Sequence, residues 1–333
     1  MNSTRQGIQT VMALILALSI TGTPACRANS GGSLVAMTPR VTISNSAQLA
    51  AASPVATWQP SGPPQAIAIV VHGITASAHS LGEVAKSLSG DGVLTYGVDL
   101  RGHGWWYSRS RIGSVGRKCD YEGSVQDVDA LIVRLRAQYP SLPMFLIGES
   151  VGAAVILRAA VNQSAAIEGV VLCAPGTRCA HAKASWIAGD LCRALFGHKI
   201  NLSRYQKAYG TEDKIALKQM EHDASVRTIY SARELLGTIH FIRENGKFAE
   251  SLPPQMPVLM LQGADDRTIK PTSARKLFAE LPCKDKRFVS IPQCGHVLLA
   301  TPRVKHVVTD SILGFINEQC SRTAMVAGSH EYQ

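Results

Sequence analysis

The sequence predicts an α/β fold, in which a mainly parallel sheet is flanked by helices and carries a helical cap. The first observation is a series of strand-length apolar runs that end at glycine, proline or another turn residue. Runs that are apolar at every position are typical of strands buried on both faces. The second observation is that segments of helical periodicity separate these runs. This alternation favours right-handed crossovers between parallel strands.

The predicted strands are Ala66–Val71, Val93–Leu100, Met144–Ile147, Val170–Ala174, Val258–Leu261 and Arg287–Ile291. The predicted helices are Val125–Tyr139, Val151–Val161, Pro271–Leu281 and Arg303–Ile316. The rhythm breaks at 180–252, a stretch with helical patterns and no convincing strand. We expect this stretch to form a cap (lid) over the carboxyl ends of the strands, where open α/β sheets bind their ligands.

The composition indicates a large folded unit. Of 333 residues, 46% are hydrophobic and only 17% charged, so the chain can bury a sizeable core and general disorder is excluded. The formal net charge is +10, without a run of five basic residues. The basic side chains either cover a solvated surface or meet an anionic interface such as lipid headgroups. No nucleic-acid-binding motif accompanies them, so we expect no nucleic-acid partner.

The N-terminus has the features of an export signal. Arg5 precedes the apolar run Val11–Ile20, which is too short for a membrane span, and small residues follow it. We assign 1–28 to a signal peptide or lipoprotein signal and 29–52 to a flexible lead-in. The protein is then exported, to the periplasm or medium. Lipidation of Cys26 and an uncleaved N-terminal anchor remain as alternatives.

Eight cysteines are present, and export would permit disulfides. Cys283 and Cys294 flank one predicted strand, and Cys173 and Cys179 flank one turn. The pairing cannot be deduced from sequence. No His and Cys cluster has the spacing of a zinc site, so we expect no metal.

The residue pattern with the clearest chemistry is Gly148-Glu149-Ser150-Val151-Gly152, which lies between a predicted strand and a predicted helix. It matches G-x-S-x-G, the tight turn that presents a nucleophilic serine at a helix N-terminus. The glycines are needed because a side chain at either position would collide with neighbouring backbone. Ser150 is the predicted nucleophile.

A serine needs a base, and the base needs a carboxylate to orient it. His296 follows the last predicted strand and fits the chain order serine, acid, histidine of this arrangement. Asp265 and Asp266 both follow the preceding strand, and the pattern alone leaves both open as the acid. The predicted oxyanion donors are the main-chain N–H groups of Val151, at the helix start, and Ile74, in the loop after the first long strand.

These motifs resemble the monoacylglycerol lipase, lysophospholipase and serine aminopeptidase-like branch of the α/β-hydrolases. The matching segments are Val71-His72-Gly73, Asp99-Leu100-Arg101-Gly102-His103-Gly104, Gly148 to Gly152, Gly263-x-x-Asp266 and Gly295-His296. The resemblance implies a hydrolase domain at 53–320 with the cap after the sixth strand, and a C-terminal tail at 321–333. It selects Asp266 as the acid, three residues after the glycine, and Ile74, directly after His-Gly.

The function implied is hydrolysis of a carboxylic ester of an acyl chain, without metal or organic cofactor. The expected partner is a small lipid-like ester, at a membrane surface if the basic residues meet lipid. The residues predicted to contact substrate are His72, Trp105, Trp106 and Trp186.

Two alternatives remain open. A serine aminopeptidase or amidase would need an acidic group in the cap to bind the substrate amine. The candidates are Glu212, Asp213, Glu221 and Asp223. A non-catalytic binding protein that has kept the fold is the other alternative.

Overall fold

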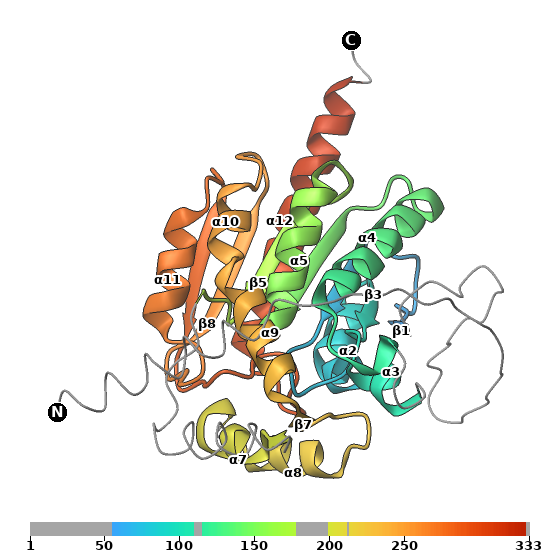
Figure 1. The fold of residues 1–333 in the computed structure, drawn as a ribbon. Helices are drawn as coiled ribbons and strands as arrows, with labels where there is room; N and C mark the ends of the chain where they lie inside the picture. Colours follow the sequence, from blue (N-terminus) through green and yellow to red (C-terminus); the bar gives the residue numbers. More distant parts are fainter. Residues whose placement is uncertain (1–54, 110–114, 178–198, 212, 331–333) are drawn as a thin grey trace. The chain divides into compact units, whose positions relative to one another are not determined.

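The fold is that of a computed structural model, which describes residues 55–109, 115–177, 199–211 and 213–330. A seven-stranded sheet has the order β1-β3-β2-β4-β5-β8-β9 (Figure 1). Its strands are β1 (Val55–Trp58), β2 (Ala66–Val71), β3 (Val93–Val98), β4 (Met144–Glu149), β5 (Gly169–Cys173), β8 (Val258–Gly263) and β9 (Lys286–Ile291). The predicted signal segment, Cys26 and Trp186 lie outside the described residues.

The sheet is parallel except at one edge, where β1 runs antiparallel to β3. All six strands expected from the sequence are present, and the predicted mainly parallel sheet is confirmed. In the ladders, Val71 pairs with Val98 of β3 and with Gly148 of β4, so the carboxyl ends of three neighbouring strands are level. Functional residues that follow these strands therefore gather at one edge of the sheet.

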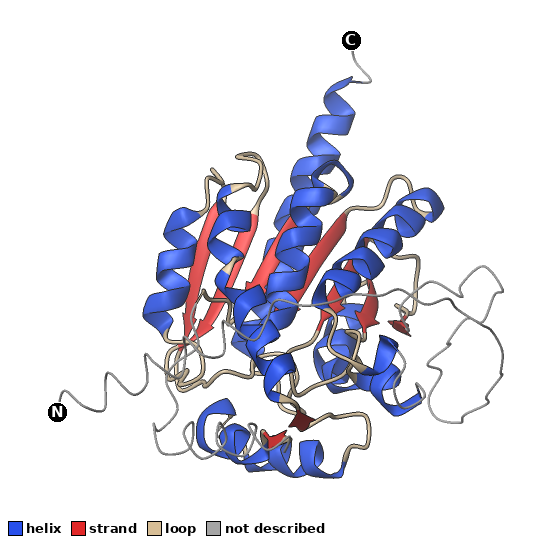
Figure 2. Ribbon diagram, viewed as in Figure 1, coloured by secondary structure: helices blue, strands red, loops and turns tan. Residues whose placement is uncertain are grey.

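Helices cover both faces of the sheet (Figure 2). A cluster of buried hydrophobic side chains fills each of the two interfaces. One face carries α4 (Tyr121–Gln138), α5 (Val151–Asn162) and α11 (Pro271–Glu280). The other carries α2 (Gly82–Gly90) and α12 (His306–His330). The strand residues of β2 are all buried, as expected for a strand between two helical layers.

The helix ends follow from local sequence. The Asp120 side chain caps α4 by accepting from the Gly123 N–H, and Pro271 stands in the first turn of α11. The last helix, α12, continues through Ile316 to His330 and so includes most of the predicted tail. None of the helices in the described ranges has both the length and the apolarity needed to cross a membrane.

The insertion between β5 and β8 differs from the prediction. Its described elements are β6 (Ile200–Asn201), α7 (Ser203–Tyr205), η5 (Gln206–Gly210), α8 (Lys214–His222), β7 (Ile229–Tyr230), α9 (Ala232–Arg243) and α10 (Asn245–Glu250). The prediction of no strand is wrong, because β6 and β7 form an antiparallel pair. The insertion follows β5, the fifth strand described, and not a sixth.

Within the described part of the insertion, α7, α8 and β7 lie beyond the carboxyl ends of the strands (Figure 1). The α9 and α10 residues Phe241, Ile242 and Ala249 belong to the main hydrophobic cluster, on the same face as α5. We therefore use "cap" below for residues 199–230. Four described cysteines, Cys119, Cys173, Cys283 and Cys320, carry free thiols.

Candidate active site

The predicted nucleophile occupies the turn between β4 and α5. Ser150 has a φ of 56°, a left-handed value that is strained for a residue with a side chain. This backbone conformation places Ser150 at the start of α5, with its hydroxyl beside His296. A Cβ on Gly148 would lie 2.5 Å from the Gly152 carbonyl oxygen, and one on Gly152 would lie 2.4 Å from that of Val71. Both glycines are therefore required for this turn.

The structure brings the three predicted side chains together. The Nε2 atom of His296 lies 2.8 Å from Oγ of Ser150, and its Nδ1 atom lies 2.8 Å from Oδ2 of Asp266. The residues come from the ends of β4, β8 and β9, up to 146 positions apart in the chain. An Nδ1–H that donates to Asp266 leaves Nε2 free to accept the serine hydroxyl proton. This is the geometry of nucleophile, base and orienting acid.

The structure also decides between the two neighbouring carboxylates. Asp266 is buried, and its oxygens accept hydrogen bonds from the main-chain N–H groups of Thr268 and Ile269 at 2.8 and 2.9 Å. The Gln262 amide donates to the same carboxylate at 2.8 Å. Asp265, by contrast, is exposed. Burial raises the pKa of Asp266, but His296 and these donors outweigh it and keep the pKa below its ordinary value.

Opposing effects also act on the imidazole. Burial lowers the pKa of His296, whereas the charge of Asp266, its hydrogen bond and the charge of Glu149 raise it. The net direction is upward from the ordinary histidine pKa of about 6.5.

The upward shift predicts the pH dependence of the rate. Only the neutral imidazole can take the serine proton, so kcat/KM rises with pH as His296 loses its charge. We expect the midpoint of this rise at a pH above the ordinary histidine pKa of about 6.5, because the pKa of His296 is raised. Initial rates of p-nitrophenyl ester hydrolysis from pH 5 to 9 measure it. A flat profile would exclude His296 as the base.

The predicted oxyanion donors flank the nucleophile. A small cavity beside Ser150 is lined by the loop residues Gly73 and Ile74 and by His296. A Cβ on Gly73 would lie 3.4 Å from Cβ of Ser150, so this loop passes close to the nucleophile. Val151 is the first residue of α5, where main-chain N–H groups point out of the helix. Ile74 thus borders the cavity beside Ser150, and the Val151 N–H lies at the helix start directly after Ser150.

The cap contributes contacts that sequence reasoning missed. The Tyr230 hydroxyl lies 2.5 Å from the Ile74 carbonyl oxygen and 2.9 Å from that of Arg227. The Gln206 amide donates to the Thr75 hydroxyl. On the other side, the Gly210 carbonyl accepts from the main-chain N–H of His296 at 3.0 Å. The cap therefore holds both the oxyanion loop and the histidine loop.

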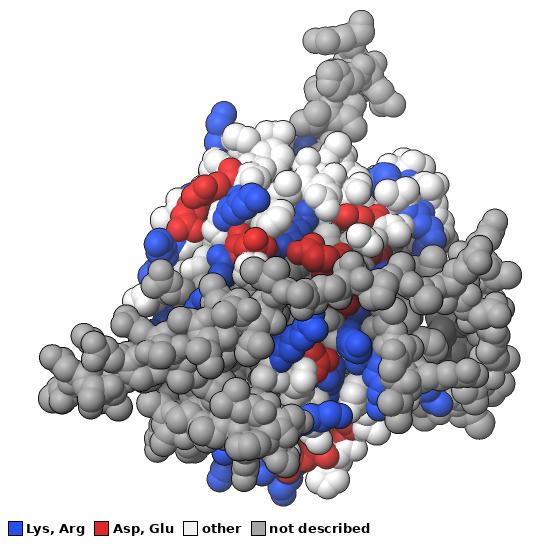
Figure 3. Space-filling view, in the orientation of Figure 1, with Lys and Arg blue, Asp and Glu red and all other residues white. Residues whose placement is uncertain are grey.

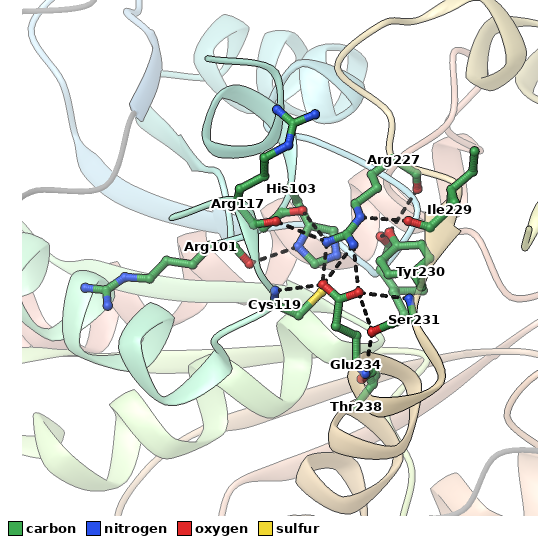
Figure 4. A network of polar contacts seen from close by, with 12 residues as sticks. Arg101, His103, Arg117, Cys119, Arg227, Ile229, Tyr230, Ser231, Glu234 and Thr238 are labelled. Carbon is green, nitrogen blue, oxygen red and sulfur yellow. Dashed lines mark hydrogen bonds and ion pairs between the residues drawn. The ribbon is translucent and has the colours of Figure 1, made fainter. Parts of the chain in front are cut away.

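Arg227 connects the cap to the loop that follows β3 (Figure 4). Its guanidinium forms a two-point ion pair with Glu234, at 2.8 Å for each bond, and donates to the Gly102 carbonyl at 3.2 Å. Glu234 also accepts from the Cys119 N–H and completes a capping box with Ser231 at the start of α9. Side chains of the insertion thus fix the loop that contains the Asp99–Gly104 motif.

His72 requires a correction. The prediction made it a substrate contact, but its side chain is completely buried and is not among the described residues that line the cavity. The Leu100 N–H donates to its Nε2 at 3.1 Å, and its Nδ1 lies 2.7 Å from the Gly73 carbonyl oxygen. Burial lowers its pKa, although Asp99 opposes this. His72 is a neutral link between the ends of β2 and β3.

Trp105 and Trp106, which were predicted to contact substrate, lie away from the cavity beside Ser150. Trp105 and Trp106 are in α3 (Gly104–Arg109), packed edge to face with ring centroids 5.8 Å apart. Trp105 is 41% exposed, and neither ring is among the described residues lining the cavity beside Ser150. The Trp105 N–H donates to Asp99, and a Cβ on Gly104 would overlap that carboxylate. The Asp99–Gly104 motif thus holds the loop after β3 in its conformation. Within the described ranges, no group of three His, Cys, Asp or Glu residues could hold a metal ion.

Comparison with known proteins decides the family. The sequence model described as "Serine aminopeptidase, S33" matches residues 62–303, which is more than half of the chain. The chain belongs to the S33 serine aminopeptidase family. The predicted branch of the α/β-hydrolases and the predicted enzyme class, a hydrolase, are thereby confirmed.

Relatives of this S33 family member include two lipases. It is 26% identical to the monoglyceride lipase of Rattus norvegicus over 276 residues, which covers 82% of this chain and 88% of the relative. It is 23% identical to the monoacylglycerol lipase of Mycolicibacterium smegmatis, with coverages of 76% and 89%. The fold also matches a soluble variant of the Saccharomyces cerevisiae monoglyceride lipase with a TM-score of 0.70 at 17% identity, covering 86% and 97% of the chains.

Proposed function

We propose that this protein is a serine hydrolase that cleaves carboxylic esters of acyl chains, of the monoacylglycerol or lysophospholipid type. The observation that carries the proposal is the continuous hydrogen-bonded series from Ser150 through His296 to Asp266. The named activities of the two lipase relatives support the choice of an ester.

The proposed reaction has two stages. His296 takes the proton of Ser150 as the hydroxyl oxygen attacks the ester carbonyl, and the N–H groups of Ile74 and Val151 stabilise the oxyanion. The imidazolium then gives its proton to the leaving alcohol, and an acyl-enzyme remains. Water attacks this ester with His296 again as base, and the acid leaves.

An aminopeptidase or amidase is the second candidate, favoured by the description of the family. It needs a carboxylate that can receive the substrate amine. Three of the predicted candidates already have partners: Glu221 pairs with Lys207 at 2.5 Å, Asp223 accepts from the Ser225 hydroxyl at 2.6 Å, and Asp213 accepts from the Ile215 N–H at 2.8 Å. Glu212 lies outside the described residues. These contacts favour the ester.

A substrate panel tests the choice. We expect 1-monoacylglycerols and lysophospholipids of increasing chain length to be hydrolysed at least about 100-fold faster, in kcat/KM, than aminoacyl amides. This preference reflects the lining of the described cavity beside Ser150: its carboxylate, Glu149, is only 2% exposed and already accepts hydrogen bonds from the main-chain N–H groups of Leu298 and Leu299. Faster cleavage of the amides would replace the esterase proposal with the aminopeptidase.

The proposed setting is outside the cytoplasm, either in the periplasm or secreted, with lipidated Cys26 as the alternative. Basic and acidic side chains are interspersed on the face shown in Figure 3. This favours a solvated surface over a dedicated basic patch, so membrane association rests on the net charge of +10 alone. The mass of the mature N-terminal peptide tests cleavage of the signal, because an intact Met1 terminus would contradict a cleaved signal peptide and leave the uncleaved anchor.

A further inference from the structure

Glu149, the residue before the nucleophile, is a buried carboxylate with a distinctive set of partners. It ends β4 and is only 2% exposed. Its Oε1 accepts hydrogen bonds from the main-chain N–H groups of Leu298 and Leu299 at 2.5 and 2.7 Å, and its Oε2 accepts from that of Ala300 at 3.3 Å. One side chain thus receives three consecutive main-chain donors.

These donors follow His296 by two to four positions. The carboxylate therefore ties the loop that carries the base to the strand that carries the nucleophile. Burying a carboxylate is costly unless donors replace its water, and three N–H groups do so here. Among the described residues, no Lys or Arg forms an ion pair with it.

The charged and titratable groups around Glu149 and His296 lie at or after the carboxyl ends of four strands, β4, β5, β8 and β9. His296 faces Asp266 after β8 and Glu149 at the end of β4. Glu149 in turn faces His296 and the thiol of Cys173, which is its register partner at the end of β5. Burial raises the pKa of Glu149 above its ordinary value, and the amide donors and the charge of His296 offset only part of this rise. The charges of two carboxylates, Asp266 and Glu149, therefore act on the imidazole.

We propose that Glu149 is a positioning residue for His296, which holds the histidine loop against the nucleophile strand and adds a second negative charge that stabilises the imidazolium. This role rests on the proposed function, because the imidazolium forms only if His296 takes the serine proton. Asp266 sets the tautomer of His296 through its hydrogen bond to Nδ1. Glu149 instead holds the main chain of the histidine loop, and its negative charge acts on the imidazole without a direct hydrogen bond.

Glu149→Gln tests the proposal. The amide keeps the size of the side chain, removes the charge and places an NH₂ group among N–H donors. We expect the pKa of His296 to fall by roughly half a unit to one unit, since a nearby negative charge favours the charged imidazole. We also expect kcat to fall by about 10- to 100-fold, with KM changed less than about threefold. An unchanged pKa of His296, or an unchanged kcat, would overturn the proposal.

Glu168→Gln is the matched control. Glu168 is also near β4 but at its opposite end, where it accepts from the Met144 N–H and pairs with Arg136. Its replacement should leave both the pKa of His296 and kcat unchanged. A shift as large as that of Glu149→Gln would show a non-specific effect and overturn the proposal.

If Glu149→Gln does not fold, Glu149→Asp is the second variant. It keeps the charge and withdraws the carboxylate from the three amides. We expect kcat to fall by at least about fivefold, while the pKa of His296 changes by less than about 0.3 units. Wild-type kcat in this variant would overturn the proposal.

The pKa of His296 is read by NMR titration of the imidazole protons, assigned by their loss in His296→Ala. This measurement needs no substrate. An enzyme without esterase activity but with the expected shift in Glu149→Gln would refute the proposed function and keep the charge coupling. An active enzyme without the shift would refute the role of Glu149 alone.

Discussion

Replacement of Ser150 by alanine is expected to lower kcat for p-nitrophenyl ester hydrolysis by roughly 10⁵- to 10⁶-fold. The variant loses the attacking oxygen, so no acyl-enzyme can form and only binding and oxyanion stabilisation remain. The Ser150 hydroxyl has His296 as its described partner, so its loss leaves the core and the glycine turn in place. The thermal midpoint should therefore change by no more than a few degrees.

Ser321→Ala controls for the loss of a hydroxyl. Ser321 is exposed on α12, where it donates to the Asn317 carbonyl, and its replacement should not affect turnover. Turnover by Ser150→Ala within tenfold of wild type would remove Ser150 from the mechanism.

Asp266→Asn has the second largest expected effect, a loss of about 10³- to 10⁴-fold in kcat at pH 7. A neutral amide no longer stabilises the imidazolium, and its NH₂ group can turn the histidine to the tautomer that carries its proton on Nε2. That proton would face Ser150 and block proton transfer. The loss in kcat should be smaller at higher pH, because hydroxide can then remove the serine proton in place of the imidazole.

The chain offers a control one residue away. Asp265 has the same side chain on the same turn, but it is exposed. Asp265→Asn should retain kcat within about twofold, as is usual for a surface substitution. Equal losses in the two variants would show that the whole turn, and not the Asp266 carboxylate, is required.

The elements that sequence predicts best are those whose signal is local. A buried strand such as Ala66–Val71 is apolar at every position. The tight turn at Ser150 is marked by Gly148 and Gly152, because neither position has room for a side chain. The edge strand Val55–Trp58 was missed because it is only four residues long and half-buried. The β6 and β7 strands are two residues each and exist through their pairing, which no local pattern reveals.

The site residues divide in the same way. Chain order and motif indicated Ser150 and His296, each of which follows a strand, whereas the choice of Asp266 over Asp265 came from the family resemblance. Tyr230 and Gly210 were missed because their contacts with Ile74 and His296 join segments far apart in the chain. His72 was assigned to substrate because it lies next to the oxyanion loop, whereas its burial and bond to Leu100 depend on the packed structure. A carboxylate at the end of a buried strand was the available signal for Glu149.

Reaction with a fluorophosphonate probe, followed by mass spectrometry of the digested protein, tests the central claim most directly. The probe phosphonylates only a serine whose hydroxyl is activated by a base. The account predicts one adduct per chain on the Ser150 peptide, formed more slowly in Asp266→Asn and absent in Ser150→Ala. A folded wild-type protein that remains unlabelled, or is labelled at another residue, would contradict it.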